Sequence, residues 1–290
     1  MAWEQKLCVE DRVEKALFFG ESGRRKYAVI HEPSEAVAPQ DPILVCHPHF
    51  EEKLWAHRVL VGFSREAADR GHPVLRFDLS GQGDSEGEIE QFDFEDLEAD
   101  VDEALALLQQ QFPGRPFLAG LRLGGTLAGR CASRNGASAV LWEPVLDPMT
   151  WVQEVLRTNL AFQLRHHGTV LKKRDDLIRD LRNGGTVQIE GYGLTADFFS
   201  KLMQSEGLLG PGFPGGCREV LGITIRKRRS KNGSPLERAV GGWNGTLKAV
   251  HAHIQDEPFW GQCPRYREVS EELFHRTLDW MEGVSRGRDS

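Results

Sequence analysis

The sequence lacks the features that would place the chain in a membrane or on nucleic acid. No apolar run approaches the ~20 residues that a membrane-spanning helix needs. The first residues, MAWEQKLCVEDR, lack the apolar core of a signal peptide. The net charge of -7 argues against a general nucleic-acid or membrane-surface binder. We therefore expect a cytoplasmic protein with no membrane span and no nucleic-acid partner.

Cysteine is scarce, and its five copies are scattered without any C-x-x-C pair. This pattern indicates reduced thiols, because a disulfide framework or a zinc site needs paired cysteines at short spacing. We expect no metal and no cofactor. The cysteines are Cys8, Cys46, Cys131, Cys217 and Cys263.

Short apolar runs and helical periodicity predict an α/β fold. A chain of 290 residues, 40% of them hydrophobic, suits one large domain with an insertion, or at most two domains. Strands that alternate with helices predict a mostly parallel, eight-stranded sheet with helices on both faces. The predicted strands span residues 16–19, 26–31, 42–46, 73–78, 116–120, 139–142, 220–225 and 247–253. The predicted helices span residues 57–70, 94–110, 125–134 and 270–281.

The region from residue 147 to residue 216 breaks this alternation. Because it lies between two core strands, we expect a helical lid over a pocket at the carboxyl ends of the strands. The core would then comprise residues 1–146 and 217–290. Helical stretches in the lid span residues 150–162, 169–182 and 195–205, before a run rich in glycine and proline at 207–216. The lid carries a basic group, more typical of a solvated helix face than of an anion site: Arg165, His166, His167, Lys172, Lys173 and Arg174.

Three segments carry a family pattern. The first, at residues 45–52, follows the third strand, where an oxyanion loop would lie. The second, at 77–85, reads D-x-x-G-x-G-x-S, with glycines that permit tight turns. The third, at 119–125, matches the nucleophile elbow G-x-S-x-G except at its centre, and its glycines suit a strained turn with closely packed backbones. In this order and at this spacing, the segments resemble the α/β-hydrolase superfamily.

Longer stretches sharpen the resemblance. The sequences HPHFEEKLWAHR, LRFDLSGQGDSEGE, GLRLGGTLA, IEGYGLTADF and DEPFWGQ resemble the exosortase A system-associated hydrolases of type 2. The similarity covers roughly residues 42–280. It implies a hydrolase-like fold in the setting of PEP-CTERM protein sorting and exopolysaccharide loci, and it supplies no substrate.

All three positions of a Ser-acid-His triad are replaced. The nucleophile position holds Arg122, whose guanidinium has no lone pair with which to attack. The stretch that should carry the acid, 225–231, is cationic, and the loop that should carry the histidine, 255–260, has none. Only His251 and His253 lie near it in sequence. We therefore expect serine-type acyl transfer to be absent.

Arg122 requires an explanation of its own. The elbow places it at a helix N-terminus, where the dipole already favours negative charge, so an anion should lie nearby. Glu51 and Glu52 of the neighbouring loop are natural partners. We favour a buried Arg–Glu pair that fills an inactive site; the alternative is that Arg122 binds an anionic ligand such as a carboxylate. The residues expected around such a ligand are Arg122, Glu51, Glu52, His49, Phe50, Leu123 and Trp260.

Other residues offer weaker candidates. Cys46 could be a thiolate nucleophile if a cation lowered its pKa, but a cysteine that ends a buried strand is more often core. Four histidines could hold a metal, although satisfied local histidines explain them better: His47, His49, His251 and His253.

These residues support two main hypotheses about function, and a third hypothesis is less favoured. The first is an inactive homologue kept as a ligand-binding or accessory protein. Its partners would be a small-molecule, acyl or carboxylate ligand and a second copy of the chain or an accessory protein. The second is a hydrolase or acyl-transfer enzyme with a non-serine mechanism. Its acting residues would be Arg122 with Glu51, Glu52, Cys46 or His253. A structural interaction protein is the third possibility.

Overall fold

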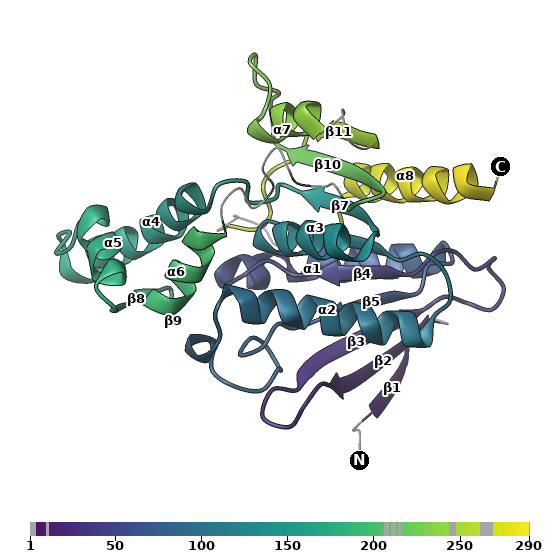
Figure 1. Cartoon of the computed structure of the whole chain (residues 1–290), viewed down its shortest axis with the longest axis horizontal. Helices are drawn as coiled ribbons and strands as arrows, with labels where there is room; N and C mark the ends of the chain where they lie inside the picture. Colours follow the sequence, from purple (N-terminus) through teal and green to yellow (C-terminus); the bar gives the residue numbers. More distant parts are fainter. Residues whose placement is uncertain are drawn as a thin grey trace.

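The computed structural model describes residues 4–9, 12–205, 209, 213, 216–243, 248–261 and 269–289. Nine strands form its central sheet (Figure 1). They are β1 (Glu4–Val9), β2 (Arg12–Phe19), β3 (Lys26–Glu32), β4 (Ile43–Cys46), β5 (Val74–Phe77), β6 (Phe117–Leu121), β7 (Ser138–Trp142), β10 (Glu219–Ile225) and β11 (Lys248–Ile254). Their order across the sheet is β1-β2-β3-β5-β4-β6-β7-β10-β11. Neighbours from β5 to β11 run parallel, whereas the pairs β1–β2, β2–β3 and β3–β5 are antiparallel.

The mostly parallel sheet with helices on both faces is confirmed. Each of the eight predicted strands has a counterpart, although residue 247 of the last one lies outside the described residues. The ninth, β1, was not predicted. It pairs with β2 from Glu4 opposite Leu17 to Val9 opposite Arg12. Its charged sequence EQKLCV carries no strong strand signal, and only the pairing identifies it.

Strand β4 shows how the two faces of the sheet are filled. Ile43 and Val45 pack with α1 (Glu51–Asp69) and α8 (Glu271–Asp289). Leu44 and Cys46 face the other side, which is covered by α2 (Phe94–Gln111), α3 (Leu123–Asn135) and α7 (Pro235–Trp243). Successive side chains of a strand point to opposite faces, so this short strand contributes to both cores. A 3-10 turn, η1 (Ile89–Gln91), precedes α2.

Helix α1 begins earlier than predicted. Phe50 stands at its N-cap with φ 54°, and the helix starts at Glu51 instead of residue 57. The sequence predicts that Glu51 and Glu52 lie in a loop. This prediction is wrong, because both residues occupy the first turn of α1. Carboxylates are favourable there because the helix dipole presents its positive end. The consequence is that both side chains start from a rigid element.

The segment between β7 and β10 projects from one end of the sheet (Figure 1). We call residues 148–204 the inserted segment; it contains α4 (Pro148–His167), α5 (Arg174–Arg182), β8 (Thr186–Ile189), β9 (Tyr192–Thr195) and α6 (Ala196–Gln204). The helix predicted at 169–182 starts only at Arg174, and the β8–β9 hairpin was missed. Most of the predicted run 207–216 lies outside the described residues.

Aromatic packing fixes the inserted segment to the core. The ring of Trp151, on α4, stacks on Phe50 with centroids 5.9 Å apart. The ring of Phe198, on α6, stacks on His49 at 5.1 Å. Trp151, Phe198 and Phe50 are all buried, so this contact joins the segment to the loop that follows β4. In the described part of the chain, no helix is both long enough and apolar enough to cross a bilayer.

Candidate functional site

The turn from β6 into α3 has the geometry expected of a nucleophile elbow. Arg122 is the N-cap of α3 and has φ 55° and ψ -124°, a conformation that non-glycine residues rarely adopt. A Cβ on Gly120 would lie 2.4 Å from the carbonyl oxygen of Gly124. A Cβ on Gly124 would lie 2.2 Å from the carbonyl oxygen of His47. The predicted close backbone packing is therefore present, and it links the elbow to the loop that follows β4.

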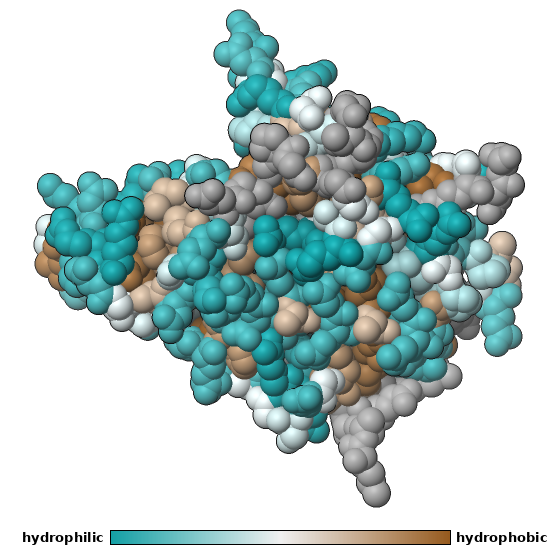
Figure 2. Space-filling model, in the orientation of Figure 1, coloured by the Kyte–Doolittle hydropathy of each residue, from teal (hydrophilic) through white to brown (hydrophobic). Residues whose placement is uncertain are grey.

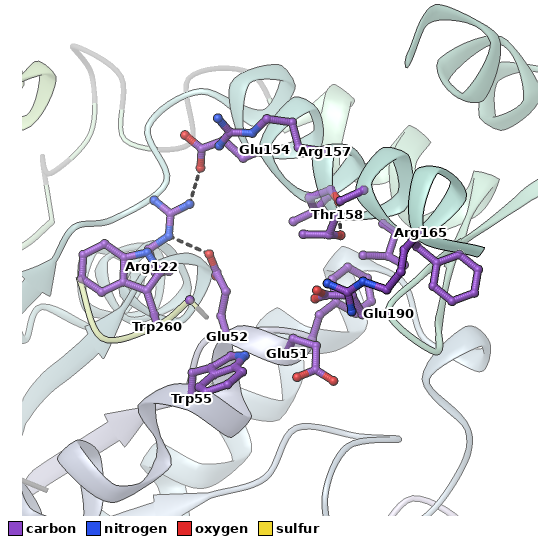
Figure 3. A pocket seen from close by; sticks show the side chains of 16 residues that line it. Glu51, Glu52, Trp55, Arg122, Glu154, Arg157, Thr158, Arg165, Glu190 and Trp260 are labelled. Atoms are coloured by element: carbon purple, nitrogen blue, oxygen red, sulfur yellow. Dashed lines mark hydrogen bonds and ion pairs between the residues drawn. The ribbon is translucent and has the colours of Figure 1, made fainter. Parts of the chain in front are cut away.

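Arg122 is held by two carboxylates that belong to different parts of the fold. Its Nε donates to Oε1 of Glu52, on α1, at 2.9 Å, and its Nη2 donates to Oε2 of Glu154, on α4 (Figure 3). The indole of Trp260 lies under the guanidinium, 5.7 Å from it. Of the two glutamates expected beside Arg122, Glu52 makes the contact, whereas Glu51 points away (Figure 3). Glu154 was not predicted.

The three charges do not balance. Burial alone would lower the pKa of Arg122, but the charges of Glu52 and Glu154 outweigh it and raise that pKa. Burial raises the pKa of Glu52, and the charge of Glu154 adds to the rise although Arg122 opposes it. One cation between two carboxylates leaves a surplus of negative charge. Water screens the pair of Arg122 (12% exposed) and Glu52 (16%) poorly, whereas Glu154 is 39% exposed.

A cavity of about 610 Å³ opens beside this triplet, between α1 and the inserted segment. Its walls are largely apolar, and the charged side chains converge on it from several elements (Figure 3). A pocket of this size and lining suits a small organic molecule. The apolar lining residues are Phe50, Trp55, Val155, Phe162, Ile189 and Trp260. The charged lining residues outside the triplet are Glu51, Arg157, Arg165 and Glu190.

Glu51 and Glu190 form a second acidic group in the cavity. Burial raises the pKa of each, and the charge of Glu51 raises that of Glu190 further. Glu190 stands at φ 52°, followed by Gly191 at φ 95°, in the two-residue turn between β8 and β9. Positive φ at both positions is typical of a tight hairpin turn. The turn therefore directs a glutamate into the cavity.

Two arginines of α4 contribute unpaired positive charge. Arg157 and Arg165 are exposed and line the cavity. Neither guanidinium makes a hydrogen bond or an ion pair with any residue that the structure describes. The sequence predicts that Arg165 lies in a solvated basic group, and it gives no signal for Arg157. Their common feature is the helical spacing that puts them on the cavity side with Glu154, which was visible only after α4 had been located.

The loops that should carry the acid and the histidine are used for other contacts. After β10, Arg226 is exposed, and its Nε lies 3.5 Å from Oε1 of Glu143. That same Oε1 accepts a hydrogen bond from the backbone N–H of Ile225 at 2.9 Å. Glu143, which follows β7, was missed by sequence analysis, and its carboxylate holds the end of β10. After β11 the loop delivers Trp260 to the cavity.

The two candidate histidines of β11 lie elsewhere. Nε2 of His251 is 2.9 Å from Oγ1 of Thr224. His251 and His253 both line a separate cavity of about 100 Å³ beside the loop after β10. Neither lines the large cavity, so the alternative mechanism that used His253 with Arg122 gains no geometric support.

The candidates near the end of β4 are buried. Cys46 is 1% exposed, and burial raises the pKa of its thiol. Burial lowers the pKa of His49 to about 3, and its Nδ1 lies 2.7 Å from Nε2 of Gln82. The ring of His47 stacks on that of His57 at 6.4 Å, and burial lowers its pKa as well. Neither His49 nor Leu123 lines the cavity, whereas Phe50 does.

The part of the chain that is described holds no group of three or more potential metal ligands.

The elbow, the sheet order and the position of the cavity are those of a hydrolase fold, and a comparison with protein families identifies the family. The model of the alpha/beta hydrolase family matches residues 39–275. This chain belongs to the alpha/beta hydrolase family.

Solved structures agree with this assignment at the level of the fold. A hypothetical protein from Pseudomonas aeruginosa has a TM-score of 0.62 and 14% identity, covering 96% of this chain and 95% of its own. An esterase from Pyrococcus furiosus has a TM-score of 0.57 and 12% identity, covering 98% and 91%. Est1E from Butyrivibrio proteoclasticus has a TM-score of 0.57 and 11% identity, covering 93% and 96%. No curated protein matches the chain.

Proposed function

We propose that this alpha/beta hydrolase is catalytically inactive toward esters and binds a small organic molecule in the cavity beneath the inserted segment. The observation that carries the proposal is the state of Arg122. It occupies the nucleophile position, and Glu52 and Glu154 both take hydrogen bonds from its guanidinium. A guanidinium is no nucleophile, and one already engaged by two carboxylates is poorly placed to polarise a substrate.

The lining of the cavity supports the same conclusion. Among the described residues that line it, none is a serine, cysteine or histidine. The only hydroxyl is that of Thr158, which donates to the carbonyl oxygen of Val155 at 2.6 Å. Cys46, the thiolate candidate, is buried with a raised pKa, the opposite of what a reactive thiolate needs. Acyl transfer through a covalent intermediate therefore has no candidate nucleophile of the usual kinds here.

The charges and walls favour an amphiphilic carboxylate as ligand. Arg157 and Arg165 are unpaired at the cavity rim, while Phe50, Trp55 and Phe162 supply apolar contact. A guanidinium binds a carboxylate in a bidentate manner, and the apolar body of the ligand would cover the aromatic walls. In this proposal residues 147–216 act as a lid on a core of residues 1–146 and 217–290. The resemblance to exosortase A system-associated hydrolases would place this binding function in that setting.

A second candidate function rests on Glu51 and Glu190. Two carboxylates with raised pKa values that face one cavity could act as general acid and base, and the structurally similar protein from Pyrococcus furiosus is an esterase. This enzyme would activate water directly and would not form a covalent intermediate. It is distinguished from the binding protein by turnover that depends on these two glutamates.

The first experiment tests for catalysis. The parent and the Arg122→Ser variant are treated with a fluorophosphonate probe and a panel of p-nitrophenyl esters. We expect no labelling and no turnover by either, because a serine at position 122 would still lack a histidine. Turnover by the parent that is lost in Glu51→Gln and Glu190→Gln would overturn the binding proposal in favour of the second candidate.

The second experiment tests binding. Thermal melts are recorded with hexanoate, octanoate and dodecanoate, since a ligand that binds only the folded state raises the melting temperature. We expect stabilisation that grows with chain length and is lost in the double variant Arg157→Gln/Arg165→Gln. Arg228→Gln, which removes an exposed arginine outside the cavity, serves as control. A stabilisation that the control variant removes equally would contradict the assignment.

A further inference from the structure

The far end of the inserted segment carries most of the large apolar side chains that are exposed in the described residues. Seven large apolar side chains are exposed among the described residues, and four of them lie between positions 162 and 171. We call residues 162–174 the segment tip. Figure 2 shows hydrophobic atoms among hydrophilic ones at this end of the molecule. The exposed side chains are those of Phe162 (49%), Leu164 (57%), Val170 (42%) and Leu171 (65%).

The tip is a built structure that presents these side chains outward. Gln163 is buried, and its Oε1 accepts hydrogen bonds from the backbone N–H groups of Leu171, at 2.7 Å, and Lys172, at 2.8 Å. Its Nε2 donates to the carbonyl oxygen of Lys172 at 3.0 Å. One side chain thereby joins the end of α4 to the turn that follows it. Leu164 and Leu171 are therefore held in the open by a satisfied polar anchor, instead of collapsing onto each other.

The same residues carry only positive charge. From Phe162 to Arg174 the sequence has four arginines or lysines, two histidines and no acid. Lys172 pairs with Asp180 at 2.7 Å, while Arg165 and Lys173 have no ion pair within the described chain. The protein as a whole has a net charge of -7, so the tip is a local exception. Exposed apolar side chains interleaved with cations are suited to the interface of an anionic bilayer.

We propose that the segment tip binds the surface of anionic lipid bilayers. Leu164, Val170 and Leu171 enter the boundary between headgroups and acyl chains, and Lys172 and Lys173 lie against the anionic headgroups. Phe162 and Arg165 belong both to the tip and to the lining of the large cavity. Docking at the tip therefore places the mouth of the cavity next to the lipid. The proposal does not depend on the function proposed above, because it concerns adsorption alone.

The test is co-sedimentation of the intact protein with two kinds of vesicle. One contains phosphatidylcholine alone, and the other contains phosphatidylcholine with phosphatidylglycerol. We expect binding to the second that weakens as salt is raised, since salt screens the cations. Leu164→Ser/Leu171→Ser should lower the apparent partition coefficient at least tenfold, because two leucine side chains no longer bury apolar surface in the bilayer. Lys172→Gln/Lys173→Gln should lower it by roughly fivefold to thirtyfold.

Matched controls separate this surface from unspecific adsorption. Leu54→Ser/Val250→Ser removes two exposed apolar side chains away from the tip, and Arg228→Gln/Lys231→Gln removes two exposed cations from the loop after β10. Both should bind vesicles like the parent. Equal losses in the controls, or no binding to anionic vesicles by a parent that circular dichroism shows to be folded, would overturn the proposal. In the latter case a protein partner would be the better explanation of the tip.

Discussion

The β6–α3 elbow and the loops after β10 and β11 make an instructive comparison. At the elbow the backbone of a hydrolase is retained, with Arg122 at φ 55° and two glycines in contact with neighbouring carbonyl groups. After β10 and β11, the positions expected to carry an acid and a histidine hold an exposed cationic loop and an aromatic residue. The elbow has the turn geometry of the family around an arginine, whereas residues 225–231 contain no acid and residues 255–260 contain no histidine.

The difference shows which parts of a site are also parts of the fold. The elbow glycines are required because β6, α3 and the loop after β4 touch there through their backbones. An acid or a histidine in the loops after β10 and β11 would not be needed for this packing.

Adding a methyl group at the elbow should cause the largest loss of stability. In Gly124→Ala the new Cβ would meet the carbonyl oxygens of His47 at 2.2 Å and Cys46 at 2.5 Å, and neither can move without displacing β4. We expect a loss of about 4 kcal/mol or more in the free energy of unfolding, measured by urea denaturation. Gly283→Ala is the control; nothing lies within 4 Å of its new Cβ in α8, so it should stabilise by about 0.5–1 kcal/mol. Similar stabilities for both variants would show that the elbow tolerates bulk.

Removing the positive charge of Arg122 should cause the second-largest loss of stability. Arg122→Met leaves the buried carboxylate of Glu52 without its partner and should cost about 3–5 kcal/mol at pH 7. Glu52→Gln should cost less, because Glu154 still pairs with Arg122. The double variant Arg122→Met/Glu52→Gln should recover most of the loss, as measured by a double-mutant cycle of urea midpoints. Additive losses would mean that the two residues do not interact.

The pH dependence of Arg122→Met follows from the pKa of Glu52. In the folded parent this pKa already lies above its ordinary value of 4.5, although Arg122 lowers it, so removing Arg122 raises it further. Ionised Glu52 then costs the variant more stability than the parent as the pH rises, and this extra cost disappears as the pH falls. The deficit of Arg122→Met relative to the parent should therefore shrink toward pH 4.5. A deficit that stays constant between pH 7 and pH 4.5 would show that loss of packing, and not the stranded charge, causes it.

The second acidic group should give a smaller effect of the opposite sign, a gain in stability. The folded-state pKa of Glu190 is raised above 4.5, so its ionised form costs stability at pH 7 and its neutral form does not. Glu190→Gln should stabilise by about 0.5 kcal/mol at pH 7, a modest value because solvent screens this residue. The gain should vanish below pH 4.5. Glu35→Gln, at an exposed position, is the control for removing one negative charge.

The smallest effect is expected at Cys46. Its thiol is buried and has a raised pKa, so iodoacetamide should leave the peptide that contains it unlabelled in the native protein. Labelling should become complete in urea, as followed by peptide mass spectrometry. Rapid labelling of Cys46 in the native protein, together with loss of ester hydrolysis on labelling, would instead support Cys46 as a thiolate nucleophile.

Sequence patterns predicted the central elements well because those elements are repetitive and buried. Strand β4 is a continuous apolar run, and α2 carries its apolar residues on one stripe, so both were located closely. The start of α1 was missed because its first turn, at Glu51 and Glu52, is polar. The β8–β9 hairpin was missed because it is short and its turn, Glu190-Gly191, is not one of the usual asparagine-glycine or aspartate-glycine pairs.

The site was predictable only in part, and charge explains why. The need of Arg122 for an anion follows from its chemistry, and Glu52 lies close in space because the segment that leads into α1 packs against the elbow at Gly124. Glu154 comes from the inserted segment, whose arrangement no local pattern determines. Glu143 resembled an ordinary loop residue, and only the hydrogen bond from Ile225 reveals its task. Long-range pairs of this type depend on tertiary packing that sequence periodicity does not encode.

The direct pairing of β7 with β10 bears on how the protein can change over evolutionary time. The chain leaves the sheet after Trp142 and returns at Glu219 beside the strand it left, with Val220 opposite Ala139. The connection from Glu143 to Arg218, which contains the inserted segment, thus begins and ends at neighbouring strands. The entropy of closing such a loop grows only with the logarithm of its length, about 0.6 kcal/mol for each doubling. Insertions and deletions within residues 148–204 would therefore leave the register of β7 and β10 almost untouched, and the segment can diversify while the sheet is conserved.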